Sequence, residues 1–249
     1  MTKTRPIFGL LILILILGAC SKGGIDNCFS SSGKITTETR TLAPFSNIIT
    51  YDNVDLILEQ GSDFKCTVEA GSNLISGIVT EVDKRGNLVI RNTNSCNWLR
   101  SYDQPVRVFL ELQKLDTLNY RSIGNITTTD TIFQDTLIIN LYEGAGRVDL
   151  LLRSRLIRAG LHYGTQKLVI SGKCGLVYGY SAGFGLIDIR NLEATLLYVN
   201  NNSSNNMYVR ATEELGATIQ SLGNIYYFGN PDVINLSKQG SGNLIHLGD

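Results

Sequence analysis

The sequence has no excess of charge of either sign and very little histidine. Its 249 residues contain 22 Lys and Arg against 22 Asp and Glu, so the formal net charge is zero. A balanced chain has no general electrostatic attraction to a nucleic-acid backbone, so we expect no nucleic-acid partner. The two histidines, His162 and His246, have no carboxylate and nucleophile at a recognisable spacing. Without a histidine cluster or a Cys-x-x-Cys pair, we predict no metal site and no other cofactor.

Helical periodicity is also absent after residue 20. No stretch of useful length repeats apolar residues at the spacing of an amphipathic helix. Apolar and polar residues alternate instead, as in Asn53–Glu59, where Val54, Leu56 and Leu58 fall on one face. The charged fraction is 18%, below the usual value of about a quarter. The composition therefore predicts an all-β chain built from strands and tight corners.

The C-terminal half, 119–249, repeats one pattern seven times. A corner rich in glycine or asparagine, such as 144–147 or 240–243, is followed each time by an apolar position. These positions are Ile126, Val148, Leu168, Ile187, Met207, Ile225 and Leu244. Successive positions are about 20 residues apart, and a regular period of this length in a strand-rich chain is typical of a solenoid.

Each repeat has an internal structure. Polar and apolar residues alternate after the corner, as in Val148-Asp149-Leu150, so one face of the strand is buried. A second strand pattern lies between corners, for example in 194–199. Each coil then supplies at least two strands, which pair with the same strands of the next coil. We predict a β-solenoid with coils of about 20 residues.

The N-terminal segment, 1–20, resembles a lipoprotein signal peptide. Lys3 and Arg5 precede an apolar run from Ile7 to Leu17, and the sequence Leu-Gly-Ala-Cys20 ends the segment. The run is shorter than the about 20 residues of a membrane-spanning helix, and small residues precede the cysteine as at a cleavage site. We predict that Cys20 is acylated and attaches the protein to a membrane. An unlipidated secreted protein is the alternative.

Two segments, 21–33 and 34–118, lie between the signal peptide and the regular repeats. The first segment is small and polar, so we expect a flexible tether. The second alternates as short strands and contains a Gly-Asn hairpin turn at 84–87. We expect it to form the opening coils or an N-terminal β cap, because the end of a solenoid needs protection from edge pairing. The repeat solenoid then occupies 119–249.

With Cys20 acylated, four of the five cysteines remain, and sequence alone allows three complete pairings. Cys66 lies on the apolar face of a strand, which favours a buried thiol. Cys28 and Cys96 lie in polar, irregular stretches of a chain exported from the cytosol, where disulfides persist. We predict a Cys28–Cys96 disulfide and a free thiol at Cys174.

The Gly-Asn corners, the stretch 226–231 and the lipobox resemble the head GIN domain family of Bacteroidetes envelope proteins. The stretches 68–74 and 96–102 are similar to that family too, so the resemblance covers about Arg40 to Leu247. It implies a right-handed β-helix related in shape to pectate-lyase-like solenoids. The family is described as auto-transporter adhesins, which implies adhesion and assigns no catalytic residues.

Acidic and basic residues at equivalent positions of the coils raise the alternative of a polysaccharide-active enzyme. Asp149 and Asp188 lie two coils apart in the alignment, with Arg147 and Arg190 beside them. Enzymes that cleave polysaccharides use carboxylates in this way, but a solvated outer face of alternating charge explains the same pattern. We therefore assign no catalytic residue and predict that the protein is not an enzyme.

Aromatic residues are dense in the last four coils. Outward residues at equivalent positions of a solenoid form a ladder about 5 Å apart, and Tyr208 and Tyr226 are such a pair. We predict that these two rings face a ligand, either a glycan or a partner protein. The competing interpretation is that the aromatic rings fill the core or stack on one another.

Three Asp-Thr-aliphatic triplets, at Thr117, Thr131 and Thr136, resemble the O-glycosylation acceptor of Bacteroidetes periplasmic proteins. The same triplets also suit the start of a strand, where aspartate closes a turn and threonine fits a pleated surface. The sequence leaves both interpretations open.

These observations predict a lipid-anchored lipoprotein of the cell envelope, attached to the outer membrane. Its expected function is that of a non-enzymatic adhesin or binding module with a glycan or protein ligand. The alternatives are the polysaccharide-active enzyme and a structural protein that assembles into homo-oligomers.

Overall fold

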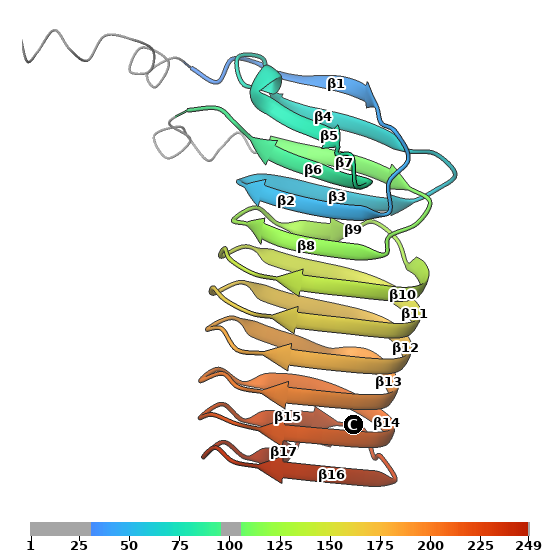
Figure 1. The fold of residues 1–249 in the computed structure, drawn as a ribbon, viewed down its shortest axis with the longest axis vertical. Helices are drawn as coiled ribbons and strands as arrows, with labels where there is room; N and C mark the ends of the chain where they lie inside the picture. The colour runs from blue at the N-terminus through green and yellow to red at the C-terminus, as the bar shows by residue number, and fades with distance from the viewer. Residues whose placement is uncertain (1–30, 96–105, 249) are drawn as a thin grey trace, which may run out of the picture.

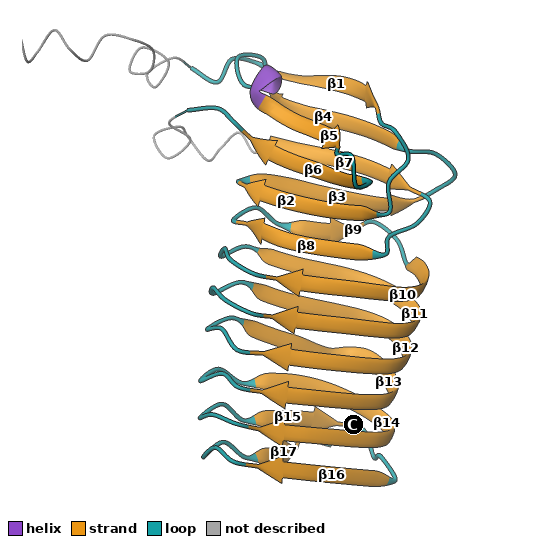
Figure 2. Ribbon diagram, in the orientation of Figure 1, coloured by secondary structure: helices purple, strands orange, loops and turns teal. Residues whose placement is uncertain are grey.

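The computed structural model describes residues 31–95 and 106–248, in which strands predominate (Figure 2). Cys20 and the predicted Cys28–Cys96 disulfide lie outside the described residues. None of the described helices is long and apolar enough to cross a membrane. The elements are β1 (Ile35–Thr41), β2 (Asn47–Asp52), β3 (Val54–Gln60), β4 (Lys65–Gly71), the 3-10 helix η1 (Ile75–Gly77), β5 (Ile78–Val82), β6 (Asn87–Asn92), β7 (Val106–Leu112), β8 (Thr117–Ser122), β9 (Ile126–Thr128), β10 (Ile132–Leu141), β11 (Arg147–Leu161), β12 (Lys167–Ser181), β13 (Leu186–Asn201), β14 (Met207–Ile219), β15 (Ile225–Phe228), β16 (Val233–Lys238) and β17 (Leu244–His246).

The strands wind into a right-handed β-solenoid with two broad faces and one core between them (Figure 1). Strands β11 to β14 contribute to both faces, because each bends in the middle and continues. The first face contains β6, β2, β8, the second halves of β10 to β14, and β16. The second face contains β7, β3, β9, the first halves of β11 to β14, β15 and β17. The predicted all-β solenoid is confirmed.

The predicted apolar row forms one continuous column in the core. Strand register pairs Ile126 with Val148 and continues coil by coil through Leu168, Ile187, Met207 and Ile225 to Leu244. The first six of these side chains are at most 1% exposed. Each strand pairs in parallel with the equivalent strand of the next coil, so the same position of every repeat is buried. The period of about 20 residues in the sequence predicts this arrangement.

Residues 34–118 differ from the regular coils in their strand order. The coil of β2 and β3 lies between the coil of β8 and β9 and the pair β6 and β7. Strand β4 runs antiparallel to β7, and β1 runs antiparallel to β4. Strand β1 is polar and largely exposed, so the described N-terminal end of the stack presents a hydrophilic strand to solvent.

The Gly-Asn corners connect neighbouring coils through asparagine side chains. Asn206 Oδ1 accepts the backbone N–H of Asn224 at 2.9 Å, and Asn224 Oδ1 accepts that of Asn243 at 2.8 Å. These bonds supply acceptors for loop N–H groups that strand pairing leaves unpaired. Glycine precedes the asparagine because a Cβ at Gly223 would collide with the backbone oxygen of Asn205. The corner motif is therefore a structural device of the stack.

Replacing Ile187 by Asp should unfold the C-terminal half of the solenoid. The side chain is 1% exposed, and an uncompensated buried charge costs about 3–5 kcal/mol. The matched control is Leu151→Asp, at a position that is 40% exposed on the second face, where the loss should stay below about 1 kcal/mol. Urea unfolding followed by circular dichroism measures both, and equal losses would contradict the core assignment.

Candidate functional site

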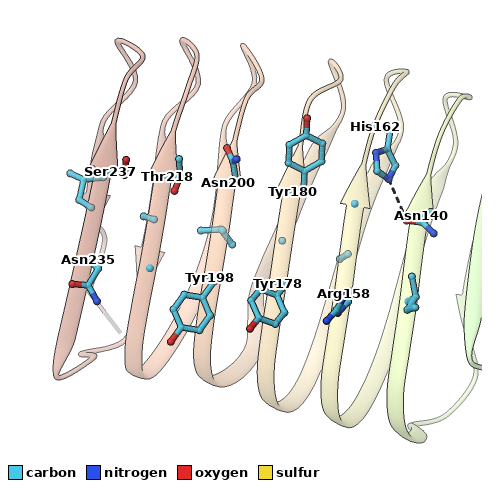
Figure 3. A pocket seen from close by; sticks show the side chains of 18 residues that line it. Asn140, Arg158, His162, Tyr178, Tyr180, Tyr198, Asn200, Thr218, Asn235 and Ser237 are labelled. Atoms are coloured by element: carbon cyan, nitrogen blue, oxygen red, sulfur yellow. Dashed lines mark hydrogen bonds between the residues drawn. The ribbon is translucent and has the colours of Figure 1, made fainter.

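A groove of about 870 Å³ crosses the first face from β10 to β16 (Figure 3). Alternate residues of these strands point outward into it, while their neighbours, such as Val199 and Ala217, are buried in the core. Strand register arranges the outward residues in two rows. The lower row contains Arg158, Tyr178, Tyr198 and Asn235, which Figure 3 labels, and by register also Ile138 and Gly216. The upper row contains Asn140, Tyr180, Asn200, Thr218 and Ser237, which Figure 3 labels, and by register also Gly160.

Stacked aromatic rings form one wall of the groove. The rings of Tyr178 and Tyr198 have centroids 5.6 Å apart and planes inclined by 21°. The guanidinium of Arg158 lies 5.6 Å from the centroid of Tyr178 and covers the N-terminal end of the stack. Hydrogen bonding to the Glu214 carboxylate raises the pKa of the Tyr198 phenol. The ring positions are thus held by their neighbours in the row.

The aromatic row stops at Gly216. A Cβ at this position would lie 2.5 Å from Cδ1 of Tyr198, so the Tyr198 ring occupies space that a side chain at 216 would need. The next member of the row, Asn235, is tied back by an Nδ2 donor bond to Glu214 at 3.2 Å. The groove therefore passes from aromatic rings to a polar strand at this point, a common arrangement in small-molecule sites.

Polar groups line the upper row. His162 lies at its N-terminal end, 3.3 Å from Asn140 Oδ1 through Nε2, and its ring stacks on Tyr142 with centroids 4.9 Å apart. Burial lowers the pKa of His162, which favours the neutral imidazole. The carbonyl oxygen of the Asn200 side chain is buried and has no donor among the described residues. With Thr218 nearby in the row, the groove combines apolar ring surface with uncharged hydrogen-bonding groups.

Tyr208 and Tyr226, the predicted ligand-facing pair, lie on the second face, away from this groove. They stack as the ladder predicts, with centroids 5.1 Å apart and planes inclined by 12°. Arg190 covers the other side of Tyr208 at 4.1 Å, and Ile245 follows Tyr226 in the next coil. Both faces of the Tyr208 ring therefore have neighbours, and one face of the Tyr226 ring is covered by Tyr208. A ligand role for this pair stays a prediction.

Sequence reasoning missed Tyr178 and Tyr198 as a site. The signal was present, because the two residues are 20 positions apart, one coil length, in the second strand of neighbouring repeats. Aligning that second strand as well as the first would have placed them in one row with Gly216. An alignment alone could not have shown that the Tyr198 ring lies over Gly216.

The candidate charged cluster consists of ion pairs on the second face. Asp149 pairs with Arg147 at 2.6 Å, and Asp188 pairs with Arg190 at 2.7 Å. The two carboxylates do occupy equivalent positions, separated by Val169 in the intervening coil. Across 31–95 and 106–248, no group of three or more His, Cys, Asp or Glu residues could hold a metal ion. The ion pairs agree with a solvated face of alternating charge.

The remaining candidate residues have simple surroundings. Thr117 and Thr136 lie in β8 and β10, Thr131 precedes β10, and all three are at least partly exposed. The Thr136 hydroxyl donates to Asp135 Oδ2 at 3.0 Å. Glycosylation of these threonines stays a prediction. Cys66 and Cys174 are free and buried, and burial raises the pKa of both thiols.

Solved structures of other proteins have folds similar to that of this chain. Comparison with curated proteins gives no match. A "putative adhesin" from Bacteroides fragilis shares 20% identity at a TM-score of 0.78, covering 86% of this chain and 97% of its own. A second "putative adhesin", from Parabacteroides distasonis, shares 18% identity at a TM-score of 0.67, with 86% and 98% covered. A "putative lipid binding protein" from the same species shares 20% identity at a TM-score of 0.61, with the same coverage.

At these identities the structural likeness shows the fold alone. The sequence model of one family, described as "Putative auto-transporter adhesin, head GIN domain", matches residues 44–231. This range lies within the stretch over which the corner motifs resemble that family, and it covers most of the chain. The protein therefore belongs to the head GIN domain family.

Proposed function

We propose that the protein is a lipid-anchored, adhesin-like lipoprotein of the outer membrane and that its groove binds a glycan. Membership of a family described as adhesins supports a non-enzymatic binding role at the cell envelope. The observation that carries the glycan assignment is the end of the aromatic row in the groove, where the Tyr198 ring lies over Gly216 and no further ring follows. An aromatic ring at the end of such a row, in an open groove, suits the flat apolar face of a sugar ring.

The chemistry of the groove favours an uncharged ligand. Its side chains are aromatic, aliphatic, amide or hydroxyl groups, apart from Arg158, which faces Tyr178, and His162, whose pKa is lowered by burial. Sugar hydroxyls can exchange hydrogen bonds with the hydroxyl and amide groups that line the groove, such as the Thr218 hydroxyl. A neutral glycan satisfies these groups without bringing a charge that the groove does not match.

Replacing Tyr198 by Ala should weaken glycan binding about tenfold, which corresponds to about 1.4 kcal/mol, because the stacking surface is lost. Purified protein would be tested first on a panel of neutral and acidic glycans. The affinity of each variant for the best ligand would then be measured by calorimetry. Tyr208→Ala is the matched control, since it removes a stacked tyrosine from the second face and should leave affinity unchanged.

Equal losses in the two variants would contradict the groove assignment. A folded wild-type protein that binds no glycan on the panel would contradict the glycan class. If Tyr198→Ala kept its affinity and Tyr208→Ala lost it, the glycan-binding site would lie on the second face and not in the groove.

The lipid anchor has its own test. Cells grown with an alkyne-tagged fatty acid should incorporate the tag into the wild-type protein and not into Cys20→Ser, because the thiol is the acylation site. Cys66→Ser is the control and should remain tagged, since that thiol is buried in the core. A tag that persists in Cys20→Ser would refute the anchor.

Self-assembly is a second candidate, and one feature favours it. All six residues of β16 are exposed, with Ile234 at 44% and Leu236 at 50%. Within the described residues β16 pairs on one side only, with β14. An unpaired apolar edge strand is a template for pairing with another chain. Light scattering of the samples used for calorimetry reports this association directly.

A further inference from the structure

The loops that lead from the first face to the second face lie along one narrow edge of the solenoid, the loop edge (Figure 2). Seven of them follow β8, β10, β11, β12, β13, β14 and β16, at 123–125, 142–146, 162–166, 182–185, 202–206, 220–224 and 239–243. In these seven described loops one residue is charged, Glu143, and it is paired with Arg121. The chain as a whole is 18% charged, so the loop edge is depleted in charge.

Large apolar side chains protrude from this uncharged edge. Ile123 is 53% exposed, Tyr163 68%, Phe184 73% and Leu222 68%. Each comes from a different loop, so together they form an interrupted apolar ridge along the stack. Exposed large apolar side chains that recur along one uncharged edge indicate an interaction surface.

The opposite edge has a different character. There the strands bend with few loops, and exposed ion pairs join Lys114 to Asp116, Arg155 to Asp135 and Lys173 to Glu193. One aromatic residue on that edge, Phe133, is 58% exposed, but it lies among these charged side chains. Absence of charge is therefore a property of the loop edge and not of the solenoid as a whole.

The chain also arrives at the body on the loop edge. Strand β1 begins there (Figure 1), at Ile35, which pairs with Gly71 and is 54% exposed. Ile35 follows Cys20 by fifteen positions, a length that spans at most about 50 Å when fully extended. A lipid at Cys20 would therefore tether the body from this edge, with at most that length of chain between the edge and the membrane.

We propose that the loop edge rests on the surface of a lipid bilayer, with Tyr163, Phe184 and Leu222 in its interfacial region. This inference rests on the lipid anchor proposed above. Interfacial burial removes apolar surface from water and requires no charged group to be desolvated. Aromatic side chains are favoured in that region of a bilayer.

A bilayer suits this edge better than a protein or a glycan does. A stable protein interface buries about 800 Å² on each partner, and a narrow convex ridge offers little surface to a rigid body. A fluid interface instead conforms around separate loop tips. Among the basic residues that flank the loops, Arg147 and Lys167 are each paired with an aspartate, and the Lys238 ammonium donates to Asn243 Oδ1. We therefore expect contact that depends little on anionic lipid or on salt.

Tryptophan reporters in the acylated full chain test the proposal. The sequence has one tryptophan, Trp98, so Trp98→Phe gives a silent background. Phe184→Trp then reports from the loop edge, and Phe133→Trp is the matched control on the opposite edge. Each protein is incorporated into phosphatidylcholine vesicles with and without bromine on the acyl chains, after circular dichroism has confirmed its fold.

The proposal predicts that brominated lipid quenches most of the emission of the Phe184→Trp reporter and little of the control, unchanged in high salt. Equal emission from the two reporters, or quenching that salt reverses, would overturn it. A blue-shifted Phe184→Trp emission without bromine quenching would indicate a protein contact and would also overturn it. Bound protein without quenching refutes the bilayer contact alone, whereas absence of vesicle-bound protein refutes the anchor and this inference together.

Discussion

In-register parallel pairing between successive coils is the constraint on which the rest of the structure depends. Ile187 pairs with Leu168 and Met207, and most residues of the coil are likewise stacked on a counterpart one coil away, although the register shifts at irregularities such as the one between Val169 and Ser171. A solenoid therefore turns a linear repeat into rows, and each row has one chemical character. The apolar core, the hydrogen-bonded asparagines of the corners, the groove and the loop edge are four such rows or sets of rows.

Much of this could be predicted from the sequence, because the period is local and recurs. The apolar column needed only the repeat period and the Gly-Asn corners. The position of the β2–β3 coil between β8–β9 and β6–β7 could not be predicted, since it depends on pairings between segments far apart in the chain. The groove was missed for a related reason: a ring face is open or covered according to the residue one coil onward. Tyr198 is followed by Gly216 and Tyr226 by Ile245.

The two proposals use different parts of one body without competing. The groove lies on a broad face, where the strands position Tyr198 within a rigid sheet. The apolar tips lie on loops, where side chains such as Phe184 can leave the sheet. A solenoid lying with its loop edge on a membrane would hold the groove upright beside the lipid surface. In such a fold the rigid strands can position a recognition site, and the loops can supply side chains that attach to a surface.

An engineered disulfide tests the register of the groove rows most directly. Asn200 and Thr218 are register partners in neighbouring coils, so their Cα atoms should be about 5 Å apart, within the range that a disulfide spans. The account predicts that Asn200→Cys with Thr218→Cys oxidises spontaneously, detected as a linked peptide pair by mass spectrometry. Asn200→Cys with Gln220→Cys, offset by two residues, should stay reduced. Linkage of the offset pair in place of the aligned pair would contradict the register and the groove built on it.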